Sequence, residues 1–217
     1  MFTLHDQGDG MLLSHGRSAS FKSAKRLLRH ILLSLSFCAA AFAQQQELHL
    51  TLRPANTAVN FTLGDVLHTV HGSFRLKEGN IDYKFGSPAV EGKIVIDATS
   101  GQSGNHSRDR KMHQEILESA RYPEIAFRPD RAEGAVTQSG TSTVQVHGIF
   151  SIHGADHEIT LPVRVEIFPD HWIADTHFTV PYVKWGIKNP STFLLRVSES
   201  VEIDIHATGS NPFAGPH

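Results

Sequence analysis

The segment Val144–Ile167, VQVHGIFSIHGADHEITLPVRVEI, decides the fold of this chain. Apolar and polar residues alternate on both sides of a turn signal at Gly154-Ala155-Asp156. Alternation with a period of two is typical of strands that bury one face. The apolar positions are Val144, Val146, Phe150 and Ile152 in the first run, and Ile159, Leu161, Val163, Val165 and Ile167 in the second. We therefore expect a long antiparallel hairpin with a tight turn.

Shorter runs of the same kind occur along the chain, at Leu48–Arg53, Val59–Leu63, Thr69–Leu76, Val90–Asp97, Ile125–Pro129, Ile173–Val183 and Val197–Ala207. Turn signals separate them at residues 77–80, 86–88 and 139–140. One segment, Ser107–Ala120, has helical spacing, because Met112, Ile116 and Ala120 recur every four residues. The pattern predicts an all-β fold, a barrel or sandwich of about eight antiparallel strands with one helix in a long connection.

The N-terminal region has the pattern of an export signal. Four basic residues between 22 and 29 precede an apolar stretch, residues 31–43, that ends in an A-x-A motif. This predicts a signal peptide over residues 1–43 with cleavage near Ala43, and Met11 is an alternative start. A lipoprotein signal at Cys38 is disfavoured because Phe37 precedes it. We expect the folded domain at residues 44–210, a loose tail at 211–217 and a periplasmic or secreted location.

Composition excludes several functions. The 217 residues carry a formal charge of −2, and the part after residue 43 carries 15 Lys and Arg against 20 Asp and Glu. A general affinity for nucleic acid, which needs a basic stripe, is therefore not expected. The single Cys excludes an intrachain disulfide framework and Cys-rich metal sites.

The 15 histidines suggest metal binding until their spacing is considered. His147 and His153 share a strand face, but six residues of strand place them roughly 20 Å apart. His153 and His157 flank the hairpin turn, which leaves a surface metal pair there open beside the reading of a solvated turn. We expect no metal site and no required cofactor.

Aromatic residues in the strand runs have two interpretations. They form either an ordinary core or the lining of an elongated apolar slot, since an eight-stranded barrel has room for one slender ligand. The candidate slot residues are Phe61, Phe74, Ile94, Ile96, Phe127, Phe150, Phe178 and Trp185. A V-H-G-x-F echo at residues 70–74 and 146–150 places a glycine inside two strands, where bulges and sharp bends occur.

The helical segment combines cations with an apolar stripe. Arg108 and Lys111 would stand near the mouth of the slot, and Met112, Ile116 and Leu117 would close one end or move as a lid. Arginine suits an anionic headgroup such as phosphate. The other interpretation is a solvated helix face, with Asp109 paired to a neighbouring cation or to the helix N-terminus.

Three groups of residues, in order along the chain, resemble the YceI-like family of lipid-binding proteins. They are Phe61 with the V-x-G-x-F of residues 70–74, the R-D … Y-P-x-x-x-F of residues 108–127, and the hairpin motif of residues 146–163. The similarity runs from about Leu48 to Ala207. It implies a lipocalin-like antiparallel β-barrel, export to the periplasm, and a long isoprenoid chain, a polyprenyl phosphate or an isoprenoid quinone, held inside. No catalytic residues follow from it.

We therefore expect an exported carrier that stores or transports an isoprenoid lipid, as a monomer or homodimer, with at most transient membrane contact. A long isoprenoid could bind tightly through burial alone, because each buried CH₂ contributes about 0.8 kcal/mol. Two alternatives stay open. One is a small hydrolase or isomerase with a site at the barrel mouth, and the other is a structural module whose barrel is filled by its own side chains.

Overall fold

The computed structural model describes residues 47–64, 69–192, 196–211 and 213, and in them the alternating runs form nine strands. The strands are β1 (Glu47–Leu52), β2 (Thr57–Gly64), β3 (Thr69–Lys84), β4 (Val90–Gln102), β5 (Glu124–Glu133), β6 (Gly140–Ile152), β7 (Ala155–Ile167), β8 (His171–Val180) and β9 (Val201–Ser210). The helical segments are the 3₁₀ turn η2 (Pro54–Asn56), the α-helix α2 (His106–Lys111) and the π-helical turn η3 (Met112–Ile116).

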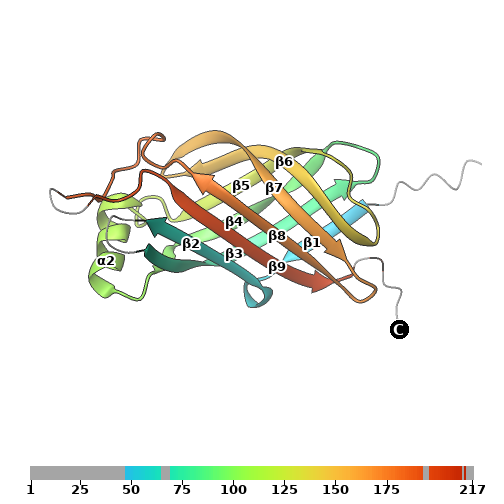
Figure 1. The fold of residues 1–217 in the computed structure, drawn as a ribbon, viewed down its shortest axis with the longest axis horizontal. Coiled ribbons are helices and arrows are strands. Elements are labelled where there is room, and N and C mark those ends of the chain that lie inside the picture. The colour runs from blue at the N-terminus through green and yellow to red at the C-terminus, as the bar shows by residue number, and fades with distance from the viewer. Residues whose placement is uncertain (1–46, 65–68, 193–195, 212, 214–217) are drawn as a thin grey trace, which may run out of the picture. The chain divides into compact units, whose positions relative to one another are not determined.

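Strand β3 closes the sheet into a barrel. Its N-terminal half pairs with β2 and its C-terminal half with β1, while its other edge pairs with β4. From β2 the strands continue through β9, β8, β7, β6 and β5 back to β4, and every pairing is antiparallel. Figure 1 shows this ring, with α2 at one end. Strands β2 to β9 close the ring as eight strands, and β1 pairs with the same edge of β3 as β2 does. This closed antiparallel eight-stranded barrel with one short helix confirms the expected fold class.

The hairpin of β6 and β7 forms as expected, with Val144 opposite Val163 and Phe150 opposite His157. Its two turn residues are His153 and Gly154, with φ of 52° and 77°. Positive φ at both central residues is the type I′ arrangement that matches the twist of a hairpin. The turn therefore begins one residue earlier than its Gly-Ala-Asp signal indicated.

One predicted turn is wrong. Residues 77–80 lie inside β3, where the pairing with β4 shifts register between Leu76 and Glu78. Gly79 serves a close approach of strands there, because a Cβ at this position would lie 2.9 Å from Leu52 Cβ. The glycine that suggested a turn instead permits a bulge and the packing of β1.

The helix is shorter than the expected Ser107–Ala120. The side chain of Asn105 caps it by accepting hydrogen bonds from the backbone N–H groups of Ser107 and Arg108. The chain then widens into η3, and Glu118, with φ of 45°, ends the helical conformation. His113 holds this ending in place, since its ring bonds to the Gly101 carbonyl at 2.8 Å and the Ser119 hydroxyl at 3.0 Å.

Inward side chains form a buried apolar cluster at the end of the barrel opposite α2. Trp172 is 2% exposed and Leu48 1%, and Tyr83 and Val90 pack with them. A second apolar cluster, nearer α2, contains Phe150, Phe178 and Tyr182. The larger space inside the barrel lies toward the helical end.

Candidate functional site: an apolar interior with one polar lip

A cavity of about 570 Å³ occupies the barrel interior at the end that carries α2. We call it the mouth cavity. Its walls are apolar residues of strands β2 to β6, β8 and β9, such as Phe61, Phe74, Ile152 and Ile203. Its volume lies in the range of roughly 300–1,000 Å³ that is typical of small-molecule sites.

A smaller cavity of about 140 Å³, the deep cavity, lies further from α2, and its lining includes Leu50, Ile94, Phe127 and Leu161. The two cavities share five lining residues, which are Ile96, Ile125, Phe150, Phe178 and Ile205. These five side chains form a waist between two adjoining spaces. The interior therefore has its larger free space at the end that carries α2 and a smaller one toward the opposite end.

The structure places seven of the eight candidate slot residues on a cavity wall. Phe61 and Phe74 line the mouth cavity, with ring centroids 5.4 Å apart, and Ile94 and Phe127 line the deep cavity. Ile96, Phe150 and Phe178 belong to the waist. Whether a ligand touches them stays a prediction.

Trp185 lines neither cavity. Its ring stacks on His157 at a centroid distance of 4.2 Å and lies 5.7 Å from the Phe150 ring. The side chain supports the wall of the barrel from behind Phe150. Strand β8 ends at Val180, before the chain reaches Trp185, and whether a ligand touches Trp185 stays a prediction.

All five candidate mouth residues, Arg108, Lys111, Met112, Ile116 and Leu117, line the mouth cavity. Ser103, Asn105 and Ser107 lie beside them, so most of the polar lining comes from one short segment, residues 103–111. The mouth cavity therefore has an apolar body and a polar lip, as a site for an amphipathic molecule would.

Arg108 is fixed by the turn that precedes the helix. Its Nε donates to Ser103 Oγ at 2.7 Å, and a terminal nitrogen donates to the Ser103 carbonyl at 2.8 Å. Asp109 accepts from the Ser103 backbone N–H at 2.9 Å. A guanidinium group has five N–H donors, so Arg108 keeps donors for an anion while its position is set. Among the described residues Asp109 makes no ion pair with a cation, one of the two partners considered for it, and it bonds to Ser103 instead.

Two lysines join the helix to the connection between β8 and β9, residues 181–200. Lys111 Nζ donates to the Pro190 carbonyl at 3.1 Å, and Lys188 Nζ lies 3.2 Å from Glu115 Oε2. Lys111, Ile187 and Pro190 all line the mouth cavity. The helix and this connection therefore meet over the cavity through two polar contacts.

Tyr182 anchors the same connection. Its hydroxyl donates to the Ser198 carbonyl at 2.5 Å, and the Ser198 N–H donates to the Gly64 carbonyl at 2.8 Å. Burial raises the pKa of Tyr182 to about 12, and nearby Glu199 adds to the rise. The hydroxyl therefore stays protonated and able to donate at neutral pH.

Sequence reasoning missed the contribution of residues 181–200 to the site. Tyr182, Ile187, Pro190 and Val197 line the mouth cavity, yet only Tyr182 and Val197 stood in expected apolar runs. The one local signal was the apolar spacing of Tyr182 and Ile187 on either side of Trp185. It could not be assigned because these residues form a turn and an irregular segment.

The two histidines that flank the hairpin turn, His153 and His157, contact different aromatic side chains. The ring centroids of His153 and Tyr122 are 4.6 Å apart, and His153 Nε2 lies 3.6 Å from Glu118 Oε1. His157 stacks on Trp185 instead. Within the described residues, no group of three or more His, Cys, Asp or Glu side chains is arranged to hold a metal ion. In the same part of the chain, no helix has the length and hydropathy needed to cross a membrane.

The fold and this interior define a class: closed antiparallel β-barrels with an apolar internal site under a short helix. A family model described as "YceI-like domain" matches residues 50–209. The chain belongs to this family, which confirms the resemblance found in its motifs.

Solved structures with the same fold are distant in sequence. BcnA of Burkholderia cenocepacia is 16% identical with a TM-score of 0.63, covering 73% of this chain and 99% of that protein. A polyisoprenoid binding domain from Saccharophagus degradans is 15% identical with a TM-score of 0.53, covering 77% and 100%. The YCEI protein of Campylobacter jejuni is 16% identical with a TM-score of 0.55, covering 66% and 86%. No curated protein sequence matches the chain.

Proposed function

We propose that this protein is an exported carrier that encloses one long isoprenoid chain in its barrel. The observation that carries the proposal is the pair of adjoining apolar cavities, about 570 and 140 Å³, of which the larger has a single polar lip. A solved relative of the same fold is described as a polyisoprenoid binding domain, which supports the same ligand class.

The interior explains why burial alone would hold such a ligand. Each CH₂ group moved from water into an apolar space contributes about 0.8 kcal/mol. The deep cavity and the waist would take the end of the chain, and the mouth cavity would take the units nearer the headgroup. An isoprenoid is nearly insoluble in water, so an aqueous compartment gives a barrel of this kind a reason to sequester it.

Binding is favoured over catalysis by the lining of the mouth cavity. Among the described residues, its walls contain no His, Cys, Asp or Glu side chain. Those are the side chains that most often serve as general acids, bases or nucleophiles. The polar groups present, two serines, an asparagine, a tyrosine, an arginine and a lysine, suit recognition of a headgroup.

A chain-length series tests the carrier function. Protein freed of lipid is mixed with isoprenoid alcohols of increasing length, and the stoichiometry and affinity are measured. We expect one chain per barrel, with affinity that rises with each added isoprene unit until the interior is full and then levels off. An affinity independent of chain length, or several chains bound per protein, would mean adsorption to the surface and would overturn the proposal.

The headgroup is assigned to the polar lip, with a phosphate near Arg108 as the specific form of the proposal. Phosphorylated and neutral isoprenoids of one length are compared on the wild type and Arg108→Ala. A loss confined to the phosphorylated ligand is expected. Equal loss for both ligands, or no loss, would remove Arg108 from this role.

Export is proposed from the N-terminal segment, which lies outside the described residues. The full chain is expressed, cells are fractionated, and the N-terminus of the accumulated protein is read by mass spectrometry. We expect a periplasmic or secreted protein that begins after Ala43. A cytoplasmic protein that retains residues 1–43 would contradict export without touching the ligand assignment.

A further inference from the structure

The mouth end of the barrel has a net positive charge, and the rest of the described residues have a net negative charge. The segments at the mouth end, residues 103–123, 153–154 and 181–200 without the undescribed 193–195, hold seven Lys and Arg but four Asp and Glu. The other described residues hold eight Lys and Arg but fifteen Asp and Glu. Positive charge therefore gathers around the opening of the mouth cavity, on a domain that is acidic as a whole.

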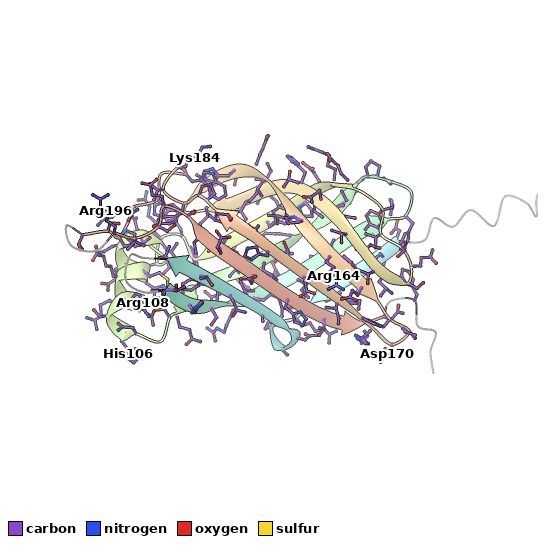
Figure 2. All side chains as sticks on the ribbon, in the orientation of Figure 1. His106, Arg108, Arg164, Asp170, Lys184 and Arg196 are labelled. Carbon is purple, nitrogen blue, oxygen red and sulfur yellow. The ribbon has the colours of Figure 1, made fainter. Side chains whose placement is uncertain are left out.

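Several of these cations have no charge partner. Arg110, Lys184 and Arg196 are exposed and make neither an ion pair nor a hydrogen bond with any residue that the structure describes. Arg108 and Lys111 bond only to uncharged oxygens. We call these five residues the basic rim. Figure 2 shows Arg108, Lys184 and Arg196 at the end of the barrel that carries α2, and Asp170 toward the opposite end.

We propose that the basic rim docks the mouth of the barrel onto an anionic phospholipid surface, which places the cavity opening against the bilayer. Charge complementarity selects this partner, because clustered Lys and Arg side chains are attracted to the negative surface potential of such a membrane. The proposal rests on the carrier function, since the rim surrounds the opening through which an apolar chain would pass.

The position of Trp185 agrees with such docking. It follows Lys184 in the chain, is half-buried at the mouth end, and stacks on His157. Tryptophan is favoured at membrane interfaces because its ring is apolar while its N–H remains a hydrogen-bond donor. The second of the two tryptophans, Trp172, is 2% exposed in the opposite end of the core. A change in tryptophan emission on docking would therefore report Trp185.

Flotation with vesicles tests the proposal. The protein is used in the form in which it accumulates, with vesicles of phosphatidylcholine alone or of equal parts phosphatidylcholine and phosphatidylglycerol. We expect flotation with the anionic vesicles only, release when salt is raised to about 0.5 M, and a change in Trp185 emission. Equal flotation with both vesicles, or with neither, would overturn docking through charge; the second outcome would leave an acidic protein as the partner to test.

Two triple variants with the same change in net charge separate the rim from overall charge. Arg110→Gln/Lys184→Gln/Arg196→Gln removes rim cations that do not line the cavity, and Arg53→Gln/Lys84→Gln/Arg164→Gln removes cations outside the mouth segments. We expect at least about a tenfold loss of anionic-vesicle binding in the first and near wild-type binding in the second. Equal losses in both would overturn the proposal.

Isoprenoid content, measured on the same samples, keeps this proposal apart from the carrier function. The rim variant should still load one neutral isoprenoid per barrel in detergent. A protein that docks but never holds an isoprenoid would contradict the carrier function and leave docking in place. A protein that holds isoprenoid but never docks would do the reverse.

Discussion

The ammonium group of Lys111 lies 3.1 Å from the carbonyl oxygen of Pro190, a residue 79 positions further along the chain. This hydrogen bond joins the helix that follows β4 to the connection that follows β8, over the opening of the mouth cavity. The parallel contact of Lys188 with Glu115 joins the same two segments. Together they form a latch between the two parts of the cavity rim.

Weakening the latch should speed ligand exchange. In Lys111→Met the hydrogen bond is lost while most of the side-chain volume stays, and Lys188→Gln removes the second contact. A hydrogen bond to a charged group is worth about 1.5–3 kcal/mol, so we expect a neutral apolar probe to leave about tenfold faster. Stopped-flow displacement measures the rate.

Lys84→Gln is the matched control for the latch. Lys84 Nζ lies 3.2 Å from Glu47 Oε1, the same distance as in the pair of Lys188 with Glu115, but this pair is outside the mouth segments. The neutral apolar probe should dissociate from Lys84→Gln at the wild-type rate. Unchanged rates in both latch variants would show that the helix and the connection do not control access.

Filling the mouth cavity should shorten the chain that the barrel accepts. Ile203 stands between Phe61 and Phe178 in the sheet and lines this cavity. The larger indole in Ile203→Trp would take up part of the space, so the affinity should level off at a shorter isoprenoid. Ala58→Trp adds the same ring at an exposed position of β2 and should leave the chain-length profile unchanged. The same profile for Ile203→Trp and the wild type would contradict an internal site.

Gly72 is required by the packing of Phe61. A Cβ at Gly72 would lie 2.2 Å from Phe61 Cζ and 2.4 Å from the Gln102 carbonyl oxygen. We expect Gly72→Ala to lower the free energy of unfolding by about 1–3 kcal/mol, because the core must shift to admit the methyl group. Urea denaturation of the lipid-free protein measures the loss.

Gly64→Ala provides the comparison, since nothing lies within 4 Å of a Cβ built there. This change should be neutral or stabilising by up to about 1 kcal/mol, through the lower entropy of the unfolded chain. Similar destabilisation by both substitutions would mean that the loss at Gly72 is a general effect of replacing glycine in a strand.

His177 should titrate with a raised pKa. Its Nδ1 lies 2.7 Å from Asp204 Oδ1 on the neighbouring strand, and Nε2 lies 3.4 Å from Glu202 Oε2. The hydrogen bond to Asp204 raises the pKa of His177 above its usual value, and the nearby charges of Asp204 and Glu202 add to the rise. In Asp204→Asn the pKa should fall, which an NMR titration of the ring protons measures.

The sign of the linked stability follows from that shift. A raised pKa in the folded protein means that the pair stabilises the fold while His177 is protonated, below its unfolded pKa of about 6.5. The contribution is lost as pH rises through the folded pKa. Because the pair is exposed, Asp204→Asn should cost no more than about 1 kcal/mol at the acid end of this range. A cost that grows with rising pH would contradict the assignment.

The sequence predicted the barrel well where each strand buries one face. The alternation from Val144 to Ile167 predicted the hairpin and divided its side chains into two faces. It did not show which face lines the interior, because a shift of one position would exchange the two sets. Seven of the eight candidate slot residues line the two cavities, and their contact with a ligand stays a prediction. Residues 77–80 misled the prediction, since glycine serves a close strand approach as readily as a turn.

The rim of the cavity was harder to predict, because its contacts join segments far apart in the chain. Nothing local to Pro190 shows that its carbonyl oxygen accepts from Lys111, and Tyr182 acquires its role through Ser198 and Gly64. The fixed position of Arg108 depends on a turn at Ser103 that only the fold defines. The spacing of apolar residues carries no information on such contacts.

The central claim is that the hollow part of this barrel holds one isoprenoid chain. Native mass spectrometry of the protein purified from the cells that encode it tests this most directly, with identification of the lipid after organic extraction. The account predicts one added mass per protein chain, which matches an isoprenoid and disappears on extraction. In Ile203→Trp this mass should be missing or should correspond to a shorter isoprenoid. Protein that is consistently empty, or an added mass unchanged in Ile203→Trp, would contradict it.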